Sequence, residues 1–424
     1  MALEPESSTH VRRLSLVAYG FVRRDGGSVA SASYLVLERL LDLGHTIEFH
    51  AIEGFVEPDG LIGREGFTYV PTTLRPIRLG WNVLERGFPA RWRKVPEFVY
   101  SLFSNRFHER AIARVIAQKH MSLHFDAFLV LGTLAPFRVS GLPCVSWPQG
   151  PPDSEWEALR SLKSQVVKYG GGGLFVALKQ LYAHKKRVCR RQFKYSDIVV
   201  GCSRWSAHAW GRAGVPRESL RAVPYAYDLN AFEPLERIAE SPAVTRFLWL
   251  GRIVPRKRLD LLLDAFRLLR AERTDVALLV IGQFAYPRGL RRLLDESSDI
   301  SGVEYRVSVA REEVPDLFRH VDVVVQPSEN ENLGSAVLEG ICCGIPAIVG
   351  PSNGSKDYLG ASSLVFDAYT PESLKTAMAR IADALKADRA AIAIESRAAA
   401  ERFLSVEVVT KQILDALCDA ISTP

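Results

Sequence analysis

The sequence predicts an α/β protein made of two doubly wound domains that face each other across a cleft. Short runs of β-branched and other apolar residues alternate with segments in which apolar residues recur at helical spacing. This alternating series starts twice, at residue 14 and again at residue 247. A length of 424 residues also favours two domains over one.

The first series begins with a strand at residues 14–19, a loop, and a helix over about residues 29–43. Gly44 ends this helix, and residues 46–51 form the next strand, so the segment is a β-loop-α-β unit. Further core strands are expected at residues 127–132, 143–147 and 198–201.

The second series repeats the pattern with a strand, a polar loop and a helix whose apolar residues share one face. Its expected strands are residues 247–250, 276–281 and 321–326, and a short helix is expected at 335–343. The boundary is placed in a Pro-containing segment, which gives domains at 1–226 and 227–402, both of the Rossmann-like type. Residues 395–421 are expected to be helical.

The composition is that of an ordinary globular protein, with 47% hydrophobic and 24% charged residues. A net charge of +6 is modest at this length and gives no reason to expect a nucleic-acid partner. Six cysteines show no metal-binding spacing, which favours a reducing compartment. No apolar leader and no membrane-spanning run is visible, so the expected location is cytoplasmic.

Two glutamates, Glu331 and Glu339, form the most informative pair. Glu331 lies in a polar loop after the strand at 321–326, at the edge where open α/β sheets bind ligands. Glu339 lies one turn into the following helix, and its side chain leans back toward the helix start. We therefore expect both carboxylates to face one pocket together with the free N–H groups of that helix. Carboxylates bind sugar hydroxyls and helix N-termini bind phosphate, so a phosphorylated sugar is the predicted ligand.

A second polar cluster follows the first strand of the second series. Gly251 permits a tight turn, and Arg252 and Lys257 are expected to project from the loop toward the cleft. An Arg fork and a Lys ammonium are suited to neutralising a diphosphate leaving group. Arg256 and Arg258 are instead expected to be solvated surface cations.

The segment around the two glutamates resembles the E-x7-E signature of the GT4-type retaining glycosyltransferases, which have the GT-B fold. The family pattern is roughly P-S-x-x-E-G-F-G-x-x-x-x-E-A-M-A-C-G-x-P-V. This chain matches it, in order, at Pro327, Ser328, Glu331, Gly334, Glu339, Cys343, Gly344 and Pro346. Asn332 and Leu333 stand where the family usually has Gly-Phe.

Other segments extend the resemblance over nearly the full length. Residues 251–258 resemble G-R-x-x-x-x-K-G, with Arg258 in place of the last glycine. Gly26 and Gly27 resemble the family's N-terminal Gly-Gly loop, which lets backbone amides approach an anion. Many relatives carry His-Gly after the strand at 143–147, whereas this chain has Gln149 and Gly150. Glutamine does not titrate, so general-base catalysis by a histidine at this position is excluded.

The resemblance implies transfer of a sugar, with retention, from a nucleoside diphosphate sugar to an acceptor hydroxyl, without a metal or other cofactor. It implies Glu331, Arg252 and Lys257 as catalytic residues and places the acceptor beside Gln149 and Gly150. The implied donor-binding residues are Gly26, Gly27, Gly251, Gly282, Val307, Leu333, Gly334, Ser335 and Glu339. The end of the chain, about residues 403–424, is implied to return to the first domain, which would bind the acceptor.

Several alternatives stay open. An epimerase or a phosphorylase acting on sugars could share this fold, and a non-catalytic scaffold could bind the same nucleotide sugar. The acceptor is not specified: a sugar, a lipid-linked sugar and a small molecule all remain open. Basic stretches at residues 86–94 and 163–194 fit either peripheral contact with the inner face of an anionic membrane or solvated helix faces. We favour the solvated faces.

Overall fold

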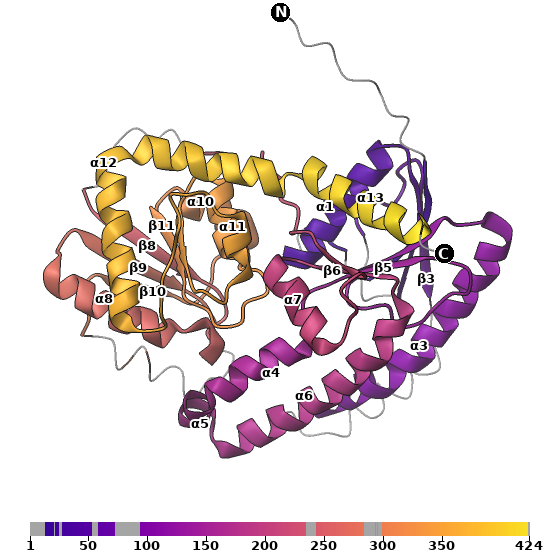
Figure 1. Cartoon of the computed structure of the whole chain (residues 1–424), viewed down its shortest axis with the longest axis horizontal. Helices are drawn as coiled ribbons and strands as arrows, with labels where there is room; N and C mark the ends of the chain where they lie inside the picture. The colour runs from indigo at the N-terminus through magenta and orange to yellow at the C-terminus, as the bar shows by residue number, and fades with distance from the viewer. Residues whose placement is uncertain are drawn as a thin grey trace, which may run out of the picture.

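The structure, a computed structural model, contains two parallel sheets, of seven and six strands, each covered by helices (Figure 1). It describes residues 13–20, 22–24, 28–52, 58–72, 94–234, 243–283, 293, 295 and 299–422. The predicted α/β class with two doubly wound domains is confirmed.

The first sheet has the order β3-β2-β1-β4-β5-β6-β7, and every neighbouring pair is parallel. Its strands are β1 (Ser15–Gly20), β2 (Thr46–Ile52), β3 (Phe67–Thr72), β4 (Ala127–Gly132), β5 (Cys144–Pro148), β6 (Ile198–Gly201) and β7 (Leu220–Ala222). The chain moves outward from β1 to β3 and then returns to β4 on the other side of β1. The strand order therefore reverses between β1 and β4, where doubly wound sheets open a crevice for ligands.

Helices of the first domain connect these strands. They are α1 (Ser28–Asp42), α3 (Lys94–Leu123), α4 (Pro152–Ser161), α5 (Lys163–Gly170), α6 (Gly172–Gln192) and α7 (Arg204–Ala213). The buried side of α1, which includes Val36, Leu37 and Leu40, packs in one apolar core with Leu16 and Leu129 of the sheet. Between β5 and β6 the chain makes α4, α5 and α6 in succession, and these extend along the lower side of the molecule in Figure 1.

The second sheet has the order β10-β9-β8-β11-β12-β13, and it is also parallel throughout. Its strands are β8 (Thr245–Leu250), β9 (Val276–Ile281), β10 (Val303–Arg306), β11 (Val323–Gln326), β12 (Ala347–Val349) and β13 (Leu364–Val365). Helices α8 (Leu259–Glu272), α10 (Val314–Phe318) and α11 (Ser335–Cys342) belong to this domain. Here too the order reverses at the first strand, between β8 and β11, and the loops after these two strands carry the predicted site residues.

The end of the chain is helical over residues 395–421, as predicted, except for a break at Ser405. Helix α12 (Pro371–Leu404) belongs to the second domain at its start, and α13 (Val406–Ser422) packs against α1 and β5 of the first domain. Ser405 separates them in an extended conformation, and its hydroxyl accepts a hydrogen bond from Val408 N at 3.3 Å. A serine at this position thus ends one helix and caps the next.

The chain crosses between the domains twice, and the two crossings touch. The first sheet ends at Ala222 and the second begins at Thr245, and the segment between them includes Tyr227. Tyr227 N donates to Leu404 O at 2.9 Å, and Tyr227 also forms a parallel bridge with Ser405. The outgoing and the returning segment are therefore joined by backbone hydrogen bonding at one place.

Candidate active site

The loop that carries Glu331 is fixed by backbone hydrogen bonds to the segment after β12. Glu331 N donates to Ser352 O at 3.0 Å, and Gly354 N donates to Glu331 O at 2.8 Å. Asn353 is fully buried, and its side chain accepts from Ser355 N at 3.1 Å, which anchors the partner segment. The position of the Glu331 carboxylate is thus set by a rigid loop.

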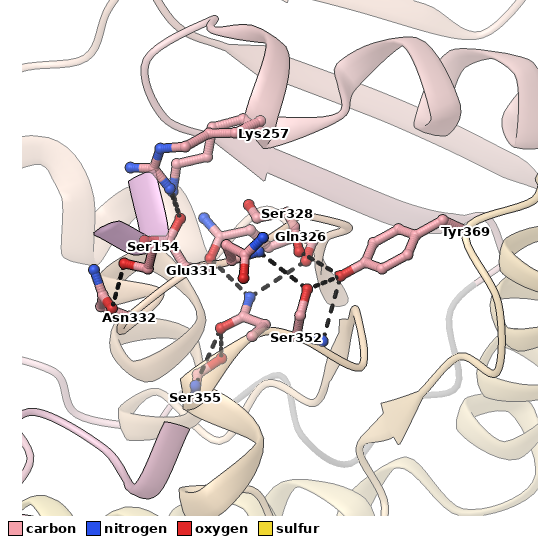
Figure 2. A network of polar contacts seen from close by, with 12 residues as sticks. Ser154, Lys257, Gln326, Ser328, Glu331, Asn332, Ser352, Ser355 and Tyr369 are labelled. Atoms are coloured by element: carbon pink, nitrogen blue, oxygen red, sulfur yellow. Dashed lines mark hydrogen bonds and ion pairs between the residues drawn. The ribbon is translucent and has the colours of Figure 1, made fainter. Parts of the chain in front are cut away.

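Two cations share the Glu331 carboxylate. Lys257 Nζ contacts Glu331 Oε2 (Figure 2). Arg256 Nη1 lies 2.9 Å from the same oxygen. All three side chains are largely buried, with exposed fractions of 17% for Arg256, 13% for Lys257 and 8% for Glu331. Both cations come from the 3-10 turn Pro255–Lys257 that follows β8. One carboxylate against two buried cations leaves this cluster with a surplus positive charge.

The ionisation of the cluster follows from burial and from these charges. Burial alone would raise the pKa of Glu331, but the charges of Arg256 and Lys257 outweigh it and lower the pKa below its ordinary value. Burial lowers the pKa of Lys257, and Glu331 opposes that effect only in part. Glu331 is therefore held as a carboxylate by its partners.

The expectation that Arg256 and Arg258 are solvated surface cations is wrong. Arg256 is part of the Glu331 cluster. Arg258 is 12% exposed and pairs with Glu329 and Asp260. The local backbone is the physical reason: the 3-10 turn brings both Arg256 and Lys257 to Glu331, and the left-handed conformation of Arg258 after it turns that side chain to Glu329 and Asp260. Arg252, by contrast, is exposed.

Glu339 has different surroundings from Glu331. It is 3% exposed, within α11, and its Oε1 lies 2.5 Å from Arg311 Nη1. Arg311 is 35% exposed at the side chain, and its guanidinium lies 6.0 Å from the ring centre of Phe232. Burial raises the pKa of Glu339, and Arg311 offsets this only in part.

A cavity of about 1230 Å³ lies between the domains. From the second domain it is lined by Arg252, Arg256, Glu331, Asn332 and Leu333, and from the end of β5 by Gln149 and Gly150. Glu339 is not among the lining residues, so the two glutamates do not face one pocket as predicted. The reason is that Glu339 lies inside the helix and turns toward Arg311, while Glu331 lies in the loop.

The remaining predicted residues that the structure describes lie near the ends of β8, β9, β10 and β11. Gly251 and Gly282 approach so closely that a Cβ on Gly282 would lie 2.0 Å from Gly251 O. Val307 follows β10 and is 59% exposed. Gly334 and Ser335 begin α11, and neither lines the cavity. Gly26 and Gly27 lie outside the described residues.

Asn332 joins the Glu331 loop to the first domain. Its backbone oxygen accepts from Ser203 Oγ at 2.7 Å, and its Oδ1 lies 3.5 Å from Ser154 Oγ (Figure 2). A Cβ on Gly150 would lie 2.1 Å from Asn332 Nδ2, so the side chain occupies the space that glycine leaves free. Asp357 adds a second contact between the domains by accepting from Arg204 N at 2.8 Å.

Sequence reasoning missed three residues of this arrangement: Arg256, Arg311 and the bridging side chain of Asn332. Arg256 was recognised as part of a basic run, but its side chain was expected to point into solvent instead of toward Glu331. Asn332 was visible as a departure from the family's Gly-Phe. Arg311 had no signal, because it lies 28 residues from Glu339 in the sequence.

In the part of the chain that the structure describes, no three His, Cys, Asp or Glu side chains are grouped to hold a metal ion. None of the helices described there is both long and apolar enough to cross a bilayer.

Part of the chain is similar to proteins that are named for sugar transfer. Residues 237–396 match the family described as glycosyl transferases group 1. A GDP-mannose-dependent alpha-(1-6)-phosphatidylinositol monomannoside mannosyltransferase of Mycolicibacterium smegmatis is 28% identical over 208 residues, 45% of this chain and 54% of that protein. A D-inositol 3-phosphate glycosyltransferase of Xylanimonas cellulosilytica is 30% identical over 233 residues, 49% of this chain and 54% of that protein. The chain thus spans about half the length of the curated relatives it matches. The resemblance to glycosyltransferases inferred from the sequence is confirmed at the level of this family over residues 237–396.

Solved structures resemble the whole chain. HepE from Anabaena, in complex with UDP and glucose, superposes with a TM-score of 0.62 at 15% identity and covers 96% of this chain and 100% of its own. WaaG, a glycosyltransferase involved in lipopolysaccharide biosynthesis, superposes with a TM-score of 0.58 at 16% identity and covers 95% and 99%. At these identities the likeness concerns the fold, and it confirms the predicted GT-B arrangement.

Proposed function

We propose that the chain is a retaining glycosyltransferase that moves a sugar from a nucleoside diphosphate sugar to an acceptor hydroxyl without a metal ion. The observation that carries this proposal is the Glu331 cluster, which borders the cavity between the domains and holds two buried cations on one carboxylate. The family match in the second domain and the fold of both domains support it.

The surplus positive charge is suited to the leaving group. Arg252 and Arg256 line the cavity, and Lys257 contacts Glu331 immediately behind it. As the bond from the anomeric carbon to the phosphate oxygen breaks, negative charge grows on the diphosphate, and these cations stabilise it. Preorganised charge of this kind is commonly worth about 10²–10³-fold in rate. These cations supply the charge that Mg²⁺ would otherwise provide, so metal independence is part of the proposal.

The environment of Glu331 bears on how retention is achieved. Its pKa is lowered by two cations, although burial opposes this, which makes the carboxylate a weak base. The lining residue on the acceptor side, Gln149, does not titrate. The acceptor hydroxyl therefore gives its proton to the departing phosphate oxygen, which lies on the same face of the sugar as the attacking oxygen. One bond forms between the acceptor oxygen and the anomeric carbon as the phosphate bond breaks, and Glu331 holds sugar hydroxyls and the developing positive charge.

The nucleotide would lie on the second domain, with Glu339 accepting hydrogen bonds from the ribose. In the structure Arg311 occupies one oxygen of that carboxylate. GDP-mannose and UDP-glucose are the first donors to test, because several relatives are GDP-mannose-dependent by name and HepE was solved with UDP and glucose.

Thermal denaturation in the presence of nucleoside diphosphates and their sugars tests donor binding first. With the donor that stabilises the chain, nucleoside diphosphate should be released only when an acceptor is present, also in EDTA, and proton NMR should show the anomeric configuration retained. Complete loss of activity in EDTA that Mg²⁺ or Mn²⁺ restores contradicts metal independence. Interconversion of the free donor would identify an epimerase, phosphate-dependent cleavage of a glycoside would identify a phosphorylase, and binding without turnover would identify a scaffold.

A further inference from the structure

The Glu331 loop, residues 327–332, needs contacts from outside to keep its shape. It lies between β11 and α11 and belongs to neither of them. Within it Asn330 has a φ of 50°, a left-handed conformation that is uncommon for residues other than glycine. The direction of the Glu331 carboxylate depends on Asn330, because a different φ there would turn the next side chain elsewhere.

Ser352, in the segment after β12, offers this loop two hydrogen-bond acceptors. Asn330 N donates to Ser352 Oγ at 3.0 Å, and Glu331 N donates to Ser352 O, also at 3.0 Å. These two amides lie on either side of the Asn330 Cα. One serine therefore fixes the left-handed residue from both sides.

Tyr369, shortly before α12, gives the Ser352 hydroxyl its direction (Figure 2). Tyr369 Oη lies 2.9 Å from Ser328 O and 2.5 Å from Ser352 Oγ. A carbonyl oxygen only accepts hydrogen bonds, so the tyrosine proton is donated to Ser328 O. Ser352 Oγ then donates to Tyr369 Oη and keeps its lone pairs for Asn330 N. Only one arrangement of the two protons satisfies all these contacts.

The Tyr369 hydroxyl is itself held in place. The Phe366 ring packs across the Tyr369 ring, with 5.3 Å between the ring centres and an angle of 89° between the planes. A Cβ on Gly350 would lie 2.6 Å from Tyr369 Oη, so glycine leaves the hydroxyl the space that it needs. Burial raises the pKa of Tyr369 above its ordinary value of 10.0, and the hydroxyl therefore keeps its proton at neutral pH.

We propose that Tyr369 is a positioning residue for Glu331. Through Ser352, its hydroxyl sets the turn at Asn330 and with it the place of the Glu331 carboxylate at the edge of the cavity. Neither Tyr369 nor Ser352 lines the cavity, so both act through the loop and not on a substrate. This inference rests on the proposed function, which gives Glu331 its role beside the transferred sugar.

Turnover and nucleotide binding are measured first. Tyr369→Phe removes the hydroxyl and keeps the ring, and Ser352→Ala removes the next hydroxyl in the series. Each should lower kcat by about tenfold or more, because displacing a catalytic group by about 1 Å can cost about 10²-fold in rate. The affinity for the nucleoside diphosphate, measured by calorimetry, should change by less than about twofold. An unchanged kcat in both variants overturns the proposal.

Ser363→Ala is the matched control. Ser363 Oγ accepts from Ala347 N at 3.0 Å, as Ser352 Oγ does from Asn330 N, but this contact lies at the opposite end of β12. The variant should lower the melting temperature about as much as Ser352→Ala does and leave kcat unchanged. An equal fall of kcat in Ser363→Ala and Ser352→Ala would show a general effect of stability, and the proposal would be wrong.

Combined variants test whether Tyr369 acts through Glu331. Once Glu331→Gln has removed the catalytic charge, Tyr369→Phe should lower the remaining kcat by less than about twofold, since residues that act through one another are not additive. Tyr369→Phe/Ser352→Ala gives the same test without the loss of a charge, because kcat should fall no further than in Ser352→Ala alone. A further fall of about tenfold in either combination contradicts the proposal.

Hydrogen exchange followed by mass spectrometry needs no substrate and separates this inference from the proposed function. Amides of residues 327–332 should exchange faster in Tyr369→Phe and Ser352→Ala than in the wild type, and at the wild-type rate in Ser363→Ala. If the wild-type chain transfers no sugar from any donor, the proposed function fails. Faster exchange in Tyr369→Phe would then still support the positioning of the loop, and unchanged exchange would overturn it.

Discussion

Glu331 and Glu339 are buried carboxylates of one short segment, yet their surroundings differ in almost every respect. Glu331 lies in a loop, borders the cavity and is shared by two buried cations. Glu339 lies in a helix, away from the cavity lining, and contacts one half-exposed arginine. Their pKa values accordingly move in opposite directions: burial raises both, and only at Glu331 do neighbouring cations reverse the effect.

The difference indicates that a shared motif does not imply a shared role. At Glu331 the carboxylate compensates for two cations that are costly to bury alone, and an incoming diphosphate would compete for the same cations. At Glu339 burial disfavours the charge of the carboxylate itself. Arg311 is partly exposed, so water can hydrate its guanidinium when a ligand takes its place on Glu339. The first position is suited to chemistry and the second to binding of an unreactive part of the donor.

The largest expected effect is on stability. Glu331→Gln leaves Arg256 and Lys257 buried without a counter-charge, so the free energy of unfolding should fall by about 3–5 kcal/mol. Glu339→Gln removes a charge that burial disfavours, and the loss should stay below about 1 kcal/mol. Denaturant titration at pH 7 measures both. Equal losses in the two variants would contradict the comparison.

Turnover should separate the two sites next. Lys257→Gln and Arg252→Ala should lower kcat by about 10²–10³-fold, and Glu331→Gln should lower kcat while nucleoside diphosphate binding survives.

Glu339→Gln and Arg311→Gln should mainly weaken the binding of the donor and of the nucleoside diphosphate, because an interaction made equally in the ground state and the transition state contributes to binding and not to kcat. Arg258→Gln is the matched control, because this neighbouring cation pairs with Glu329 and Asp260. Should Glu331→Gln lose diphosphate affinity while Glu339→Gln keeps it, the roles are reversed.

A substitution in the first domain can test whether the Glu331 loop depends on the contact between the domains. Asn332, the residue after Glu331, packs its side chain against Gly150. Gly150→Ala places a methyl group where the Asn332 amide lies, and it should lower kcat/KM by about tenfold or more, because an overpacked contact costs about 1–3 kcal/mol. Asn332→Gly alone should have a smaller effect, and Gly150→Ala/Asn332→Gly should recover most of the loss. Absence of recovery in steady-state kinetics would show that the two side chains do not compete for this space.

The smallest effect should be the pH dependence of stability, which differs in sign. The lowered pKa of Glu331 stabilises the fold above the unfolded value of 4.5, and this contribution is lost as pH falls through the folded pKa. The raised pKa of Glu339 acts in the opposite sense: its contribution is full below 4.5 and is lost as pH rises through the folded pKa. Unfolding free energies between pH 3 and pH 7 should therefore converge between wild type and Glu331→Gln on acidification. On the same acidification, the unfolding free energy of the wild type should rise relative to that of Glu339→Gln.

Much of the framework could be predicted because local patterns determine it. Strands β4, β6 and β9 have the predicted bounds, since each is a short buried run of apolar residues. Strands β3, β7, β10, β12 and β13 were missed: β12 has only three residues, and the other four are only partly buried. The helix break at Ser405 was missed because it serves the crossing between domains, which local propensity does not encode.

The site could be predicted only in part, for the same reason. Motif spacing located Glu331, Arg252 and Lys257, and the structure places all three at or beside the cavity. The pairing of Lys257 with Glu331 joins residues 74 positions apart. Which carboxylate receives which cation depends on how a 3-10 turn and a loop from different strands meet, and no periodicity in the sequence records that.

The joined crossings at Tyr227 and Ser405 have a mechanical consequence. Because the two described crossings between the domains are held together there, a relative rotation leaves this point nearly stationary, and displacement grows with distance from it. In Figure 1 the α12–α13 junction lies on the opposite side of the molecule from α4 and α5. The contacts that such a rotation would break first are therefore those of α4 and α5: Ser161 with Glu329, at 3.3 Å, and Gln165 with Asp260, at 2.6 Å. The molecule would then work as a clamp with its pivot at Tyr227 and its widest aperture beside α5.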